Sequence, residues 1–226
     1  MLPRTLEPEV MDTPEEAVDY DAMDHNTVNR VFVDDLLVFL RKQGREGNQP
    51  PRILDVGTGT AQIPLELCTR GLTVRVTAID LAGHMLQLAL RNVLKACQQE
   101  SIKLEQVDAK ELPYVDGQFD VVMSNSIIHH IPEPLSVLRE MSRVLKSGGA
   151  LFIRDLLRPD NAGTLDHLVV TYAGDGNAHQ QKMFRDSLHA ALRLDEVRGL
   201  LHQVGLPSGW VSQTSDRHWT IAGQQS

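Results

Sequence analysis

The stretch from Arg52 to Pro64 reads R-I-L-D-V-G-T-G-T-A-Q-I-P. Its apolar start predicts a buried strand, and the glycines at positions 57 and 59 predict a tight turn before a helical pattern that begins at Ala61. Doubly wound α/β proteins use such a strand, turn and helix to hold a nucleotide-like ligand. The rest of the chain is therefore interpreted outward from this turn.

Strands and helices alternate as far as Asp155, which is typical of a mostly parallel sheet with right-handed crossovers. The further strands are predicted at 73–79, 103–107, 119–124 and 150–154, and the helices at 61–70, 82–98 and 134–145. The helix at 134–145 is expected to stop at Ser147-Gly148-Gly149. A helix at 195–204 precedes two closing strands, 210–214 and 218–222, whose short separation predicts an antiparallel hairpin.

The two ends of this alternation are less regular. Residues 1–14 are rich in Pro and Glu and predict a mobile tail, followed by a helix that Thr13 caps and a second helix at 26–42. Turn formers at 44–51 predict a linker, and 156–193 predicts a helical insertion. We divide the chain into 1–50, with the tail and the N-terminal helices, and 51–226, the main domain with its insertion.

The composition limits the possible partners. The chain has 226 residues and a formal net charge of -8, so it has no long-range attraction for nucleic acid or for acidic membrane surfaces. It contains no apolar run of about 20 residues and does not begin like a secretory signal, which predicts a cytoplasmic protein without a membrane span. Cys68 and Cys97 predict buried, unpaired thiols. A monomer or a homodimer is expected.

The ligand of the glycine turn is a choice between a dinucleotide and a sulfonium nucleoside. The dinucleotide fingerprint needs a third Gly or Ala where this chain has Gln62. The carboxylate of Asp55 would repel a pyrophosphate at the helix N-terminus but suits a ligand with an ammonium and a sulfonium group. In the alternative interpretation, Asp55 is a turn residue that binds backbone N-H groups.

Four motifs occur in order: L-D-V-G-T-G-T-A at 54–61, A-I-D-L at 78–81, V-D-A at 107–109, and F-D-V-V-M-S-N-S-I-I-H-H-I-P-E-P at 119–134. Together they resemble the motifs of class I S-adenosylmethionine-dependent methyltransferases over about residues 50–155 and the closing hairpin. The runs S-I-I-H-H-I-P-E-P and E-M-S-R-V-L-K-S-G-G are similar to the small-molecule branch that includes ubiquinone and menaquinone biosynthesis enzymes. The resemblance implies a Rossmann-like, doubly wound sheet of seven mostly parallel strands, a terminal antiparallel hairpin and a helical lid.

The resemblance also implies a set of residues that bind S-adenosylmethionine. Asp55 and the backbone at 57–59 would receive its amino acid end, Asp80 its ribose hydroxyls, and Leu81 and Met85 its adenine. The full set is Tyr20, Asp55, Gly57, Thr58, Gly59, Asp80, Leu81, Met85, Asp108, Ala109, Asn125 and Ser126. Three alternatives remain open: Asp80 caps a helix, Met85 belongs to a helix core, and Tyr20 packs a helix on the domain.

Methyl transfer is an in-line displacement that depends mainly on positioning, and a base helps only when the acceptor must lose a proton. His129 and His130 are candidate catalytic residues, but they also suit a structural or orienting role. No metal is expected, because adjacent histidines without a further spaced ligand rarely bind one.

The predicted function is methylation of a small molecule at O, C or N. The residues S-N-S-I at 124–127 lack the Pro-Pro-aromatic motif of enzymes that methylate amines in nucleic acid. The alternatives are an NAD(P)-dependent oxidoreductase and a non-catalytic subunit that binds S-adenosylmethionine.

Overall fold

The computed structural model describes residues 1–8, 10, 12–23, 25–44 and 50–225, so Asp24 and most of the predicted linker lie outside it. The chain forms two compact units. The glycine-turn unit comprises Val10–Asn125, Ser136–Ile153 and Ala222–Ser226, and the histidine-pair unit comprises Met1–Glu9, Ser126–Leu135 and Arg154–Ile221. The division predicted at residue 50 stays a prediction.

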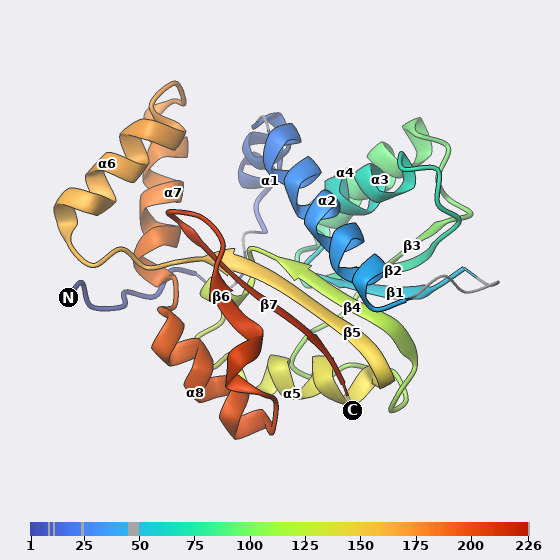
Figure 1. Ribbon diagram of the computed structural model, residues 1–226. Coiled ribbons are helices and arrows are strands. Elements are labelled where there is room, and N and C mark those ends of the chain that lie inside the picture. Colours follow the sequence, from blue (N-terminus) through green and yellow to red (C-terminus); the bar gives the residue numbers. More distant parts are fainter. Residues whose placement is uncertain (9, 11, 24, 45–49, 226) are drawn as a thin grey trace. The chain divides into compact units, whose positions relative to one another are not determined.

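A seven-stranded sheet has the order β3-β2-β1-β4-β5-β7-β6 (Figure 1). The strands are β1 Arg52–Val56, β2 Arg75–Asp80, β3 Ile102–Gln106, β4 Phe119–Asn125, β5 Leu145–Leu156, β6 Val211–Gln213 and β7 His218–Gln224. β1 pairs in parallel with β2 and β4, β2 pairs in parallel with β3, and β6 pairs antiparallel with β7. The expected sheet and terminal hairpin are confirmed, and the strand order reverses between β1 and β4, where such sheets bind ligands.

The helices of the glycine-turn unit pack on one another and on the sheet: α2 contacts α3, and α4 contacts α1, α3, β2 and β3. They are α1 Pro14–Ala22, α2 Asn26–Lys42, α3 Gln62–Cys68, α4 Gly83–Lys95 and α5 Leu135–Val144, whose first residue belongs to the other unit. The capping role of Thr13 is confirmed, because its side chain accepts from the Glu16 amide and Glu16 accepts in return.

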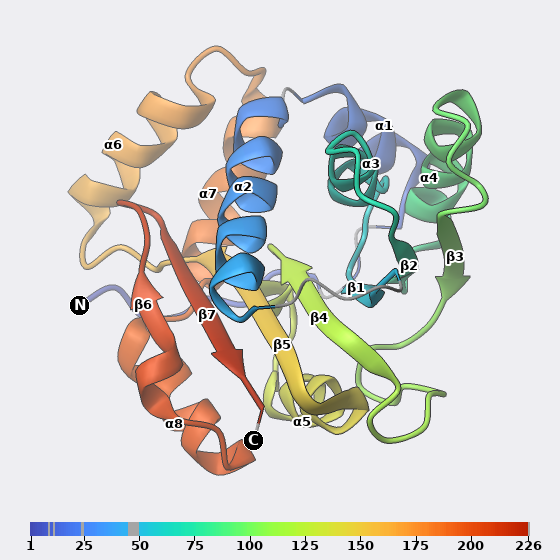
Figure 2. The ribbon, with the colours of Figure 1, turned by 45° about the vertical axis from the view of Figure 1, so that its right-hand side comes forward.

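The histidine-pair unit is built around the predicted insertion. Its helices are α6 Ala162–Ala173, α7 Ala178–Ala190 and α8 Leu194–Val204, with short 3₁₀ turns η1 Ile128–His130 and η2 Ser208–Trp210. Helices α6 and α7 lie side by side in Figures 1 and 2 and enclose an apolar cluster that includes Leu165, Leu168 and Leu188. Gly205 ends α8 in the left-handed conformation that glycine tolerates.

The start of β5 corrects one prediction. The chain does not continue as a helix to Ser147: α5 ends at Val144, and the strand starts at once with Leu145. The glycines belong to the strand because Gly148 donates its amide to the Gln225 carbonyl (2.7 Å) and Gly149 accepts from the Gln225 amide (2.9 Å). Pairing with the distant C-terminal segment therefore outweighs the local helix-stop signal.

The predicted mobile tail is also wrong for the described residues. Leu2 donates its amide to the Asp160 carbonyl (2.9 Å), and Thr5 donates to the His189 carbonyl (3.1 Å). The guanidinium of Arg4 donates to four backbone carbonyls, those of His129, Ile131, Pro132 and Ala190. Hydrogen bonds, together with Leu2 packing on the apolar cluster of α6 and α7, hold the segment in place without an apolar period.

Two smaller predictions concern the thiols and the membrane. Both cysteines are free, but Cys97 is exposed because α4 ends before it and the chain turns there with φ 55°. In the described part of the chain, no helix is long and apolar enough to cross a bilayer. The cytoplasmic location, the oligomeric state and the absence of a nucleic-acid partner stay predictions.

Helix α2 contributes a buried face to the core, and this gives a test of the fold. Phe32 is fully buried and packs edge-to-face on Phe152, with 5.2 Å between the ring centroids. We expect Phe32→Ala to lower the free energy of unfolding by about 3–5 kcal/mol, as measured by urea denaturation, because it leaves a cavity. The control Val31→Ala, at a position that is 47% exposed, should change it by less than about 0.5 kcal/mol. Equal effects would contradict this packing.

Candidate functional site

The turn after β1 is held by its own amide groups. Gly57 and Thr58 both donate to the Ile79 carbonyl (2.9 and 2.8 Å), and Gly59 donates to Oδ2 of Asp80 (2.7 Å). Gly57 and Gly59 have φ angles of 74° and 55°, a backbone conformation that favours glycine. The turn is thus fastened to the end of β2, and these three amides already have partners.

Asp80 joins the turn to the next helix. Its Oδ2 accepts from Gly59, and its Oδ1 accepts from the amide of Ala82, the N-cap residue of α4 (2.9 Å). Burial raises the pKa of this carboxyl. Asp80 therefore fastens the glycine turn to the N-cap residue of α4, and each oxygen keeps a further lone pair for a ligand.

Four buried oxygen atoms near the turn have no hydrogen-bond partner among the described residues. They are Oδ2 of Asp55, Oγ1 of Thr58, Oγ1 of Thr60 and Oδ1 of Asn125. Asp55 lies in β1 and Asn125 ends the adjacent strand β4. Buried polar atoms are nearly always hydrogen-bonded, so this group indicates a site for a ligand that supplies donors.

The charge of Asp55 strengthens this conclusion. Its side chain is buried, and the burial raises the pKa of the carboxyl to about 7. The nearby hydroxyl of Thr58 opposes this shift, although it does not meet the geometry of a hydrogen bond to Oδ2, and the charge of Asp80 adds a smaller increase. A cation placed beside Asp55 would favour the ionised form. The structure thus gives Asp55 an environment that suits a positively charged ligand, and the turn amides are bound elsewhere.

The other predicted binding residues follow β2, β3 and β4. Leu81 is 37% exposed, and Met85 is buried with Ala17 and Ala82, which supports the helix-core interpretation of Met85. Asp108 accepts from the Lys110 amide (2.9 Å). Ala109 and Ser126 are partly buried, and Ser126 has a positive φ of 59° just after β4.

Tyr20, on α1, lies beside the glycine turn. A Cβ atom on Gly59 would be 3.6 Å from Cε1 of the Tyr20 ring. Burial, followed by the charges of Asp80 and Asp55, raises the pKa of Tyr20 to about 12. Tyr20 therefore packs α1 on the unit and also places a neutral phenol near the two carboxylates.

Gln62 has a role that the sequence did not reveal. Its Oε1 accepts from Asn29 of α2 (3.0 Å), and its Nε2 donates to Oδ1 of Asp21 of α1 (3.3 Å). Asn92 of α4 donates to the same Asp21 oxygen (3.0 Å) and to the Thr60 carbonyl (3.1 Å). The side chain that departs from the dinucleotide fingerprint thus joins the N-terminal helices to the helix after the turn. Only the polarity of Gln62 signalled this in the sequence.

The histidine pair forms a separate polar cluster in the other unit. His129 is 3% exposed, and its Nδ1 lies 2.5 Å from Oδ1 of Asp155, whose Oδ2 accepts from the amides of Ile128 and His129. Burial alone would lower the pKa of His129, but the charges of Asp155 and Glu7 raise it. Conversely, burial would raise the pKa of Asp155, but His129 lowers it. The two groups therefore favour an ion pair.

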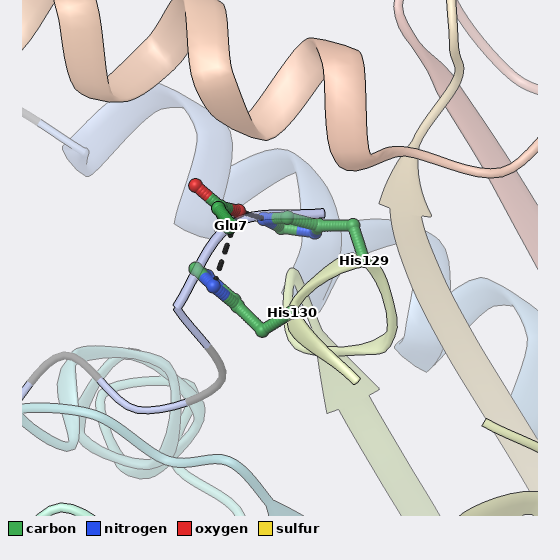
Figure 3. Close-up of side chains that lie close together, drawn as sticks. All are labelled: Glu7, His129 and His130. Atoms are coloured by element: carbon green, nitrogen blue, oxygen red, sulfur yellow. Dashed lines mark ion pairs between the residues drawn. The ribbon is translucent and has the colours of Figure 1, made fainter. Parts of the chain in front are cut away.

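Glu7 completes this cluster from the N-terminal segment, and the sequence analysis missed it. Its Oε1 lies 3.1 Å from Nδ1 of His130 and 3.6 Å from Nε2 of His129 (Figure 3). Burial raises the pKa of Glu7, and burial together with the charge of His129 lowers the pKa of His130 to about 3. His130 is therefore neutral near pH 7. Together Glu7, His129 and His130 have donor atoms that suit a metal ion.

The chain is similar to known methyltransferases in sequence. Residues 54–153 match the family described as "Methyltransferase domain". The chain is 32% identical over 178 residues to 27-O-demethylrifamycin SV methyltransferase of Amycolatopsis mediterranei, a match that covers 77% of this chain and 61% of that protein. It is 31% identical over 164 residues to ubiquinone biosynthesis O-methyltransferase of Xanthomonas campestris pv. campestris, covering 67% and 66%. The chain thus spans less than two thirds of either relative. It is also 32% identical over 192 residues to malonyl-[acyl-carrier protein] O-methyltransferase of Geobacter sulfurreducens, a match that covers 85% of this chain and 67% of that protein.

The fold is also similar to a solved structure. A SAM-dependent methyltransferase from Aquifex aeolicus aligns with a TM-score of 0.66 at 20% sequence identity, covering 95% of this chain and 99% of that chain. At this identity the similarity concerns the fold alone. It agrees with the sheet order described above.

The raised pKa of Asp55 predicts a pH-dependent stability of the ligand-free protein. The folded carboxyl titrates near 7 and the unfolded one near 4, so the folded state holds an extra proton in that interval and stability falls as the pH rises through it. Asp55→Asn should remove this slope and raise the free energy of unfolding at pH 8 by as much as about 4 kcal/mol. Urea denaturation at pH 5 and pH 8 measures both effects.

The matched control is Asp175→Asn, because Asp175 is exposed. It should leave the pH dependence unchanged. An Asp55→Asn protein with the slope of the wild type would show that Asp55 is ionised throughout this range.

Proposed function

Because the chain belongs to the class I S-adenosylmethionine-dependent methyltransferases, we propose that it transfers a methyl group from this cofactor to an oxygen atom of a small-molecule acceptor. The main support from the structure is the group of four unpartnered buried oxygens at the reversal of strand order. The oxygen acceptor is supported by the relatives, two of which are named O-methyltransferases.

The residues around the glycine turn fit the amino acid end of S-adenosylmethionine, the cofactor of this family. Oδ2 of Asp55 and Oδ1 of Asn125 would accept hydrogen bonds from its ammonium group, so both buried oxygens would gain a partner. The hydroxyls of Thr58 and Thr60 would donate to its carboxylate, because the amides of the turn are already bound.

The remaining residues of the set would bind the nucleoside. Asp80 would accept from the ribose hydroxyls through the lone pairs that its two backbone contacts leave available. Leu81 would offer its exposed surface to the adenine, with Met85 as support, and Asp108 and Ala109 would contact the adenine edge. Tyr20 and Ser126 would border the cofactor, and α1 would act as the lid that Gln62 holds.

The chemistry requires positioning more than it requires a nucleophile of the protein. When bound, S-adenosylmethionine supplies an electrophilic methyl group, and correct orientation alone provides roughly 7–11 kcal/mol of the barrier reduction. For His129 and His130 we propose a positioning role and not that of a free general base. The pKa of His130 is near 3, and Nε2 of His129 faces the Glu7 carboxylate.

Two alternative functions, an oxidoreductase and a non-catalytic subunit, predict different results in binding and activity measurements. An NAD(P)-dependent oxidoreductase is disfavoured by the antiparallel strand β7 between β5 and β6 and by the use of Gln62 to hold helices. A non-catalytic subunit would have the same cofactor site without turnover. Calorimetry with S-adenosylmethionine, S-adenosylhomocysteine and NAD addresses the first alternative.

A methylation assay addresses the second. Purified protein is incubated with S-adenosylmethionine and a panel of phenols, hydroxy acids and amines, and release of S-adenosylhomocysteine is measured. We expect turnover with hydroxyl acceptors. Binding of NAD in place of S-adenosylhomocysteine, or methylation of amines only, would overturn the proposal. Tight cofactor binding without turnover on any acceptor would favour the non-catalytic subunit.

The role of Asp80 can be tested by substitution. Asp80→Asn should weaken binding of S-adenosylhomocysteine by about 1.5–3 kcal/mol, because hydrogen bonds to a charged group are lost. Calorimetry measures the change, and circular dichroism checks that the fold survives the loss of the contact to Gly59. The control Asp116→Asn, at a side chain that is 81% exposed, should bind as the wild type does. Equal affinity in both variants would remove Asp80 from the ribose site.

A further inference from the structure

The proposed methyl transfer gives no proton-transfer step to His129 or His130, and it does not involve Glu7. We propose that these three residues form a binding site for a divalent transition-metal ion of the Zn²⁺ class, with Asp155 as the carboxylate that orients His129. The ligand atoms are Oε1 of Glu7, Nε2 of His129 and Nδ1 of His130, and they all lie within 4.8 Å of one another (Figure 3).

The separations of these atoms fit tetrahedral coordination. Zinc binds histidine nitrogen and carboxylate oxygen at about 2.0–2.2 Å, which places neighbouring ligands about 3.3 Å apart. Glu7 Oε1 lies 3.1 Å from His130 Nδ1 and 3.6 Å from His129 Nε2, on either side of this value. The separation of the two histidine nitrogens has to approach the same value on binding, and we expect the ring of His130 to make this adjustment, because Asp155 holds the ring of His129.

Two of the three ligand atoms lack a hydrogen-bond partner. Oε1 of Glu7 and Nδ1 of His130 are buried, and no described residue forms a hydrogen bond with either atom. The 3.1 Å between them does not meet the geometry of a hydrogen bond, and the ring of His130 interacts instead with the backbone of Pro8. A ring nitrogen and a carboxylate oxygen thus face each other without a hydrogen bond between them, and a cation placed there would give each atom a partner.

The surroundings of His129 match those of histidines that bind metals. Such histidines usually bind a carboxylate or a carbonyl through the ring nitrogen that does not bind the metal. Here Nδ1 of His129 lies within hydrogen-bond distance of Oδ1 of Asp155 (2.5 Å), and Nε2 is directed toward Glu7. Oδ2 of Asp155 is fixed by the amides of Ile128 and His129, so the orientation of the ring is set before an ion arrives.

Glu7 supplies the spaced third ligand that adjacent histidines need. It follows Arg4, whose guanidinium donates to the carbonyls of His129, Ile131 and Pro132, so the turn that carries the histidines also holds the segment that carries Glu7. Two nitrogens and one oxygen favour Zn²⁺ and its transition-metal neighbours, because Mg²⁺ and Ca²⁺ prefer oxygen ligands alone. A tetrahedral ion here keeps its fourth position for water or another oxygen ligand.

The test is metal binding by the full chain without an affinity tag. Protein dialysed against a chelator and then against buffer is titrated with ZnCl₂ by calorimetry, and with Co²⁺ while the visible spectrum is recorded. We expect one equivalent of Zn²⁺ and the absorption bands of tetrahedral Co²⁺. Glu7→Gln and His130→Gln should each weaken Zn²⁺ binding more than about tenfold, since even outer-shell substitutions cost that much.

His202→Gln is the matched control, because His202 is an exposed histidine of α8 in the same unit. It should bind Zn²⁺ as the wild type does. A thermal melt without metal shows whether each variant is folded, and Zn²⁺ should raise the Tm of the wild type more than that of Glu7→Gln.

Three results would overturn the proposal: no stoichiometric Zn²⁺ binding by the wild type, equal binding by the wild type and folded Glu7→Gln, or equal binding of Mg²⁺. The titrations are made without S-adenosylmethionine. A failure of methyl transfer would therefore leave the metal site standing, and a failure of metal binding would leave the proposed methyl transfer standing.

Discussion

Three hydrogen bonds from the turn after β1 to the end of β2 determine the geometry of the cofactor site. The amides of Gly57, Thr58 and Gly59 donate to the Ile79 carbonyl and to Asp80, and the two glycines permit the required positive φ angles. Because these amides already donate hydrogen bonds within the protein, the buried polar atoms without a partner are side-chain oxygens, among them Oδ2 of Asp55. These side-chain oxygens lack hydrogen-bond partners within the protein, which lowers its stability, and they are the acceptors that we propose for a cationic ligand. Functional sites commonly carry such a cost in stability.

The elements that local patterns specify were predictable from the sequence. The seven strands and the cap at Thr13 follow from periodicity and turn chemistry over a few neighbouring residues. The start of β5 was not predictable, because Gly148 and Gly149 pair with Gln225 at the other end of the chain. A local signal for a helix stop cannot report a hydrogen bond made across such a sequence separation.

In the candidate site too, the sequence predicted what local motifs specify and missed what depends on contacts between distant residues. Asp55, Asp80 and Asn125 could be proposed from the sequence because they stand near strand ends within recognisable motifs, and strand ends meet at one edge of a parallel sheet. Gln62 was noted only for breaking a fingerprint, since its partners Asp21 and Asn29 lie on helices far away in sequence. Glu7 was assigned to a mobile tail because the hydrogen bonds of one arginine leave no periodic pattern.

The cluster around His129 places four titratable groups where water is largely excluded, and their charges must balance. Asp155 and His129 form an ion pair, which leaves Glu7 as an additional acid beside the neutral ring of His130. The guanidinium of Arg4 adds a second positive charge to the same surroundings, so charge balance alone does not require a further cation. The proposed metal site rests instead on geometry, because Oε1 of Glu7 lies 3.1 Å from His130 and 3.6 Å from His129, and side chains of all three residues converge on one place.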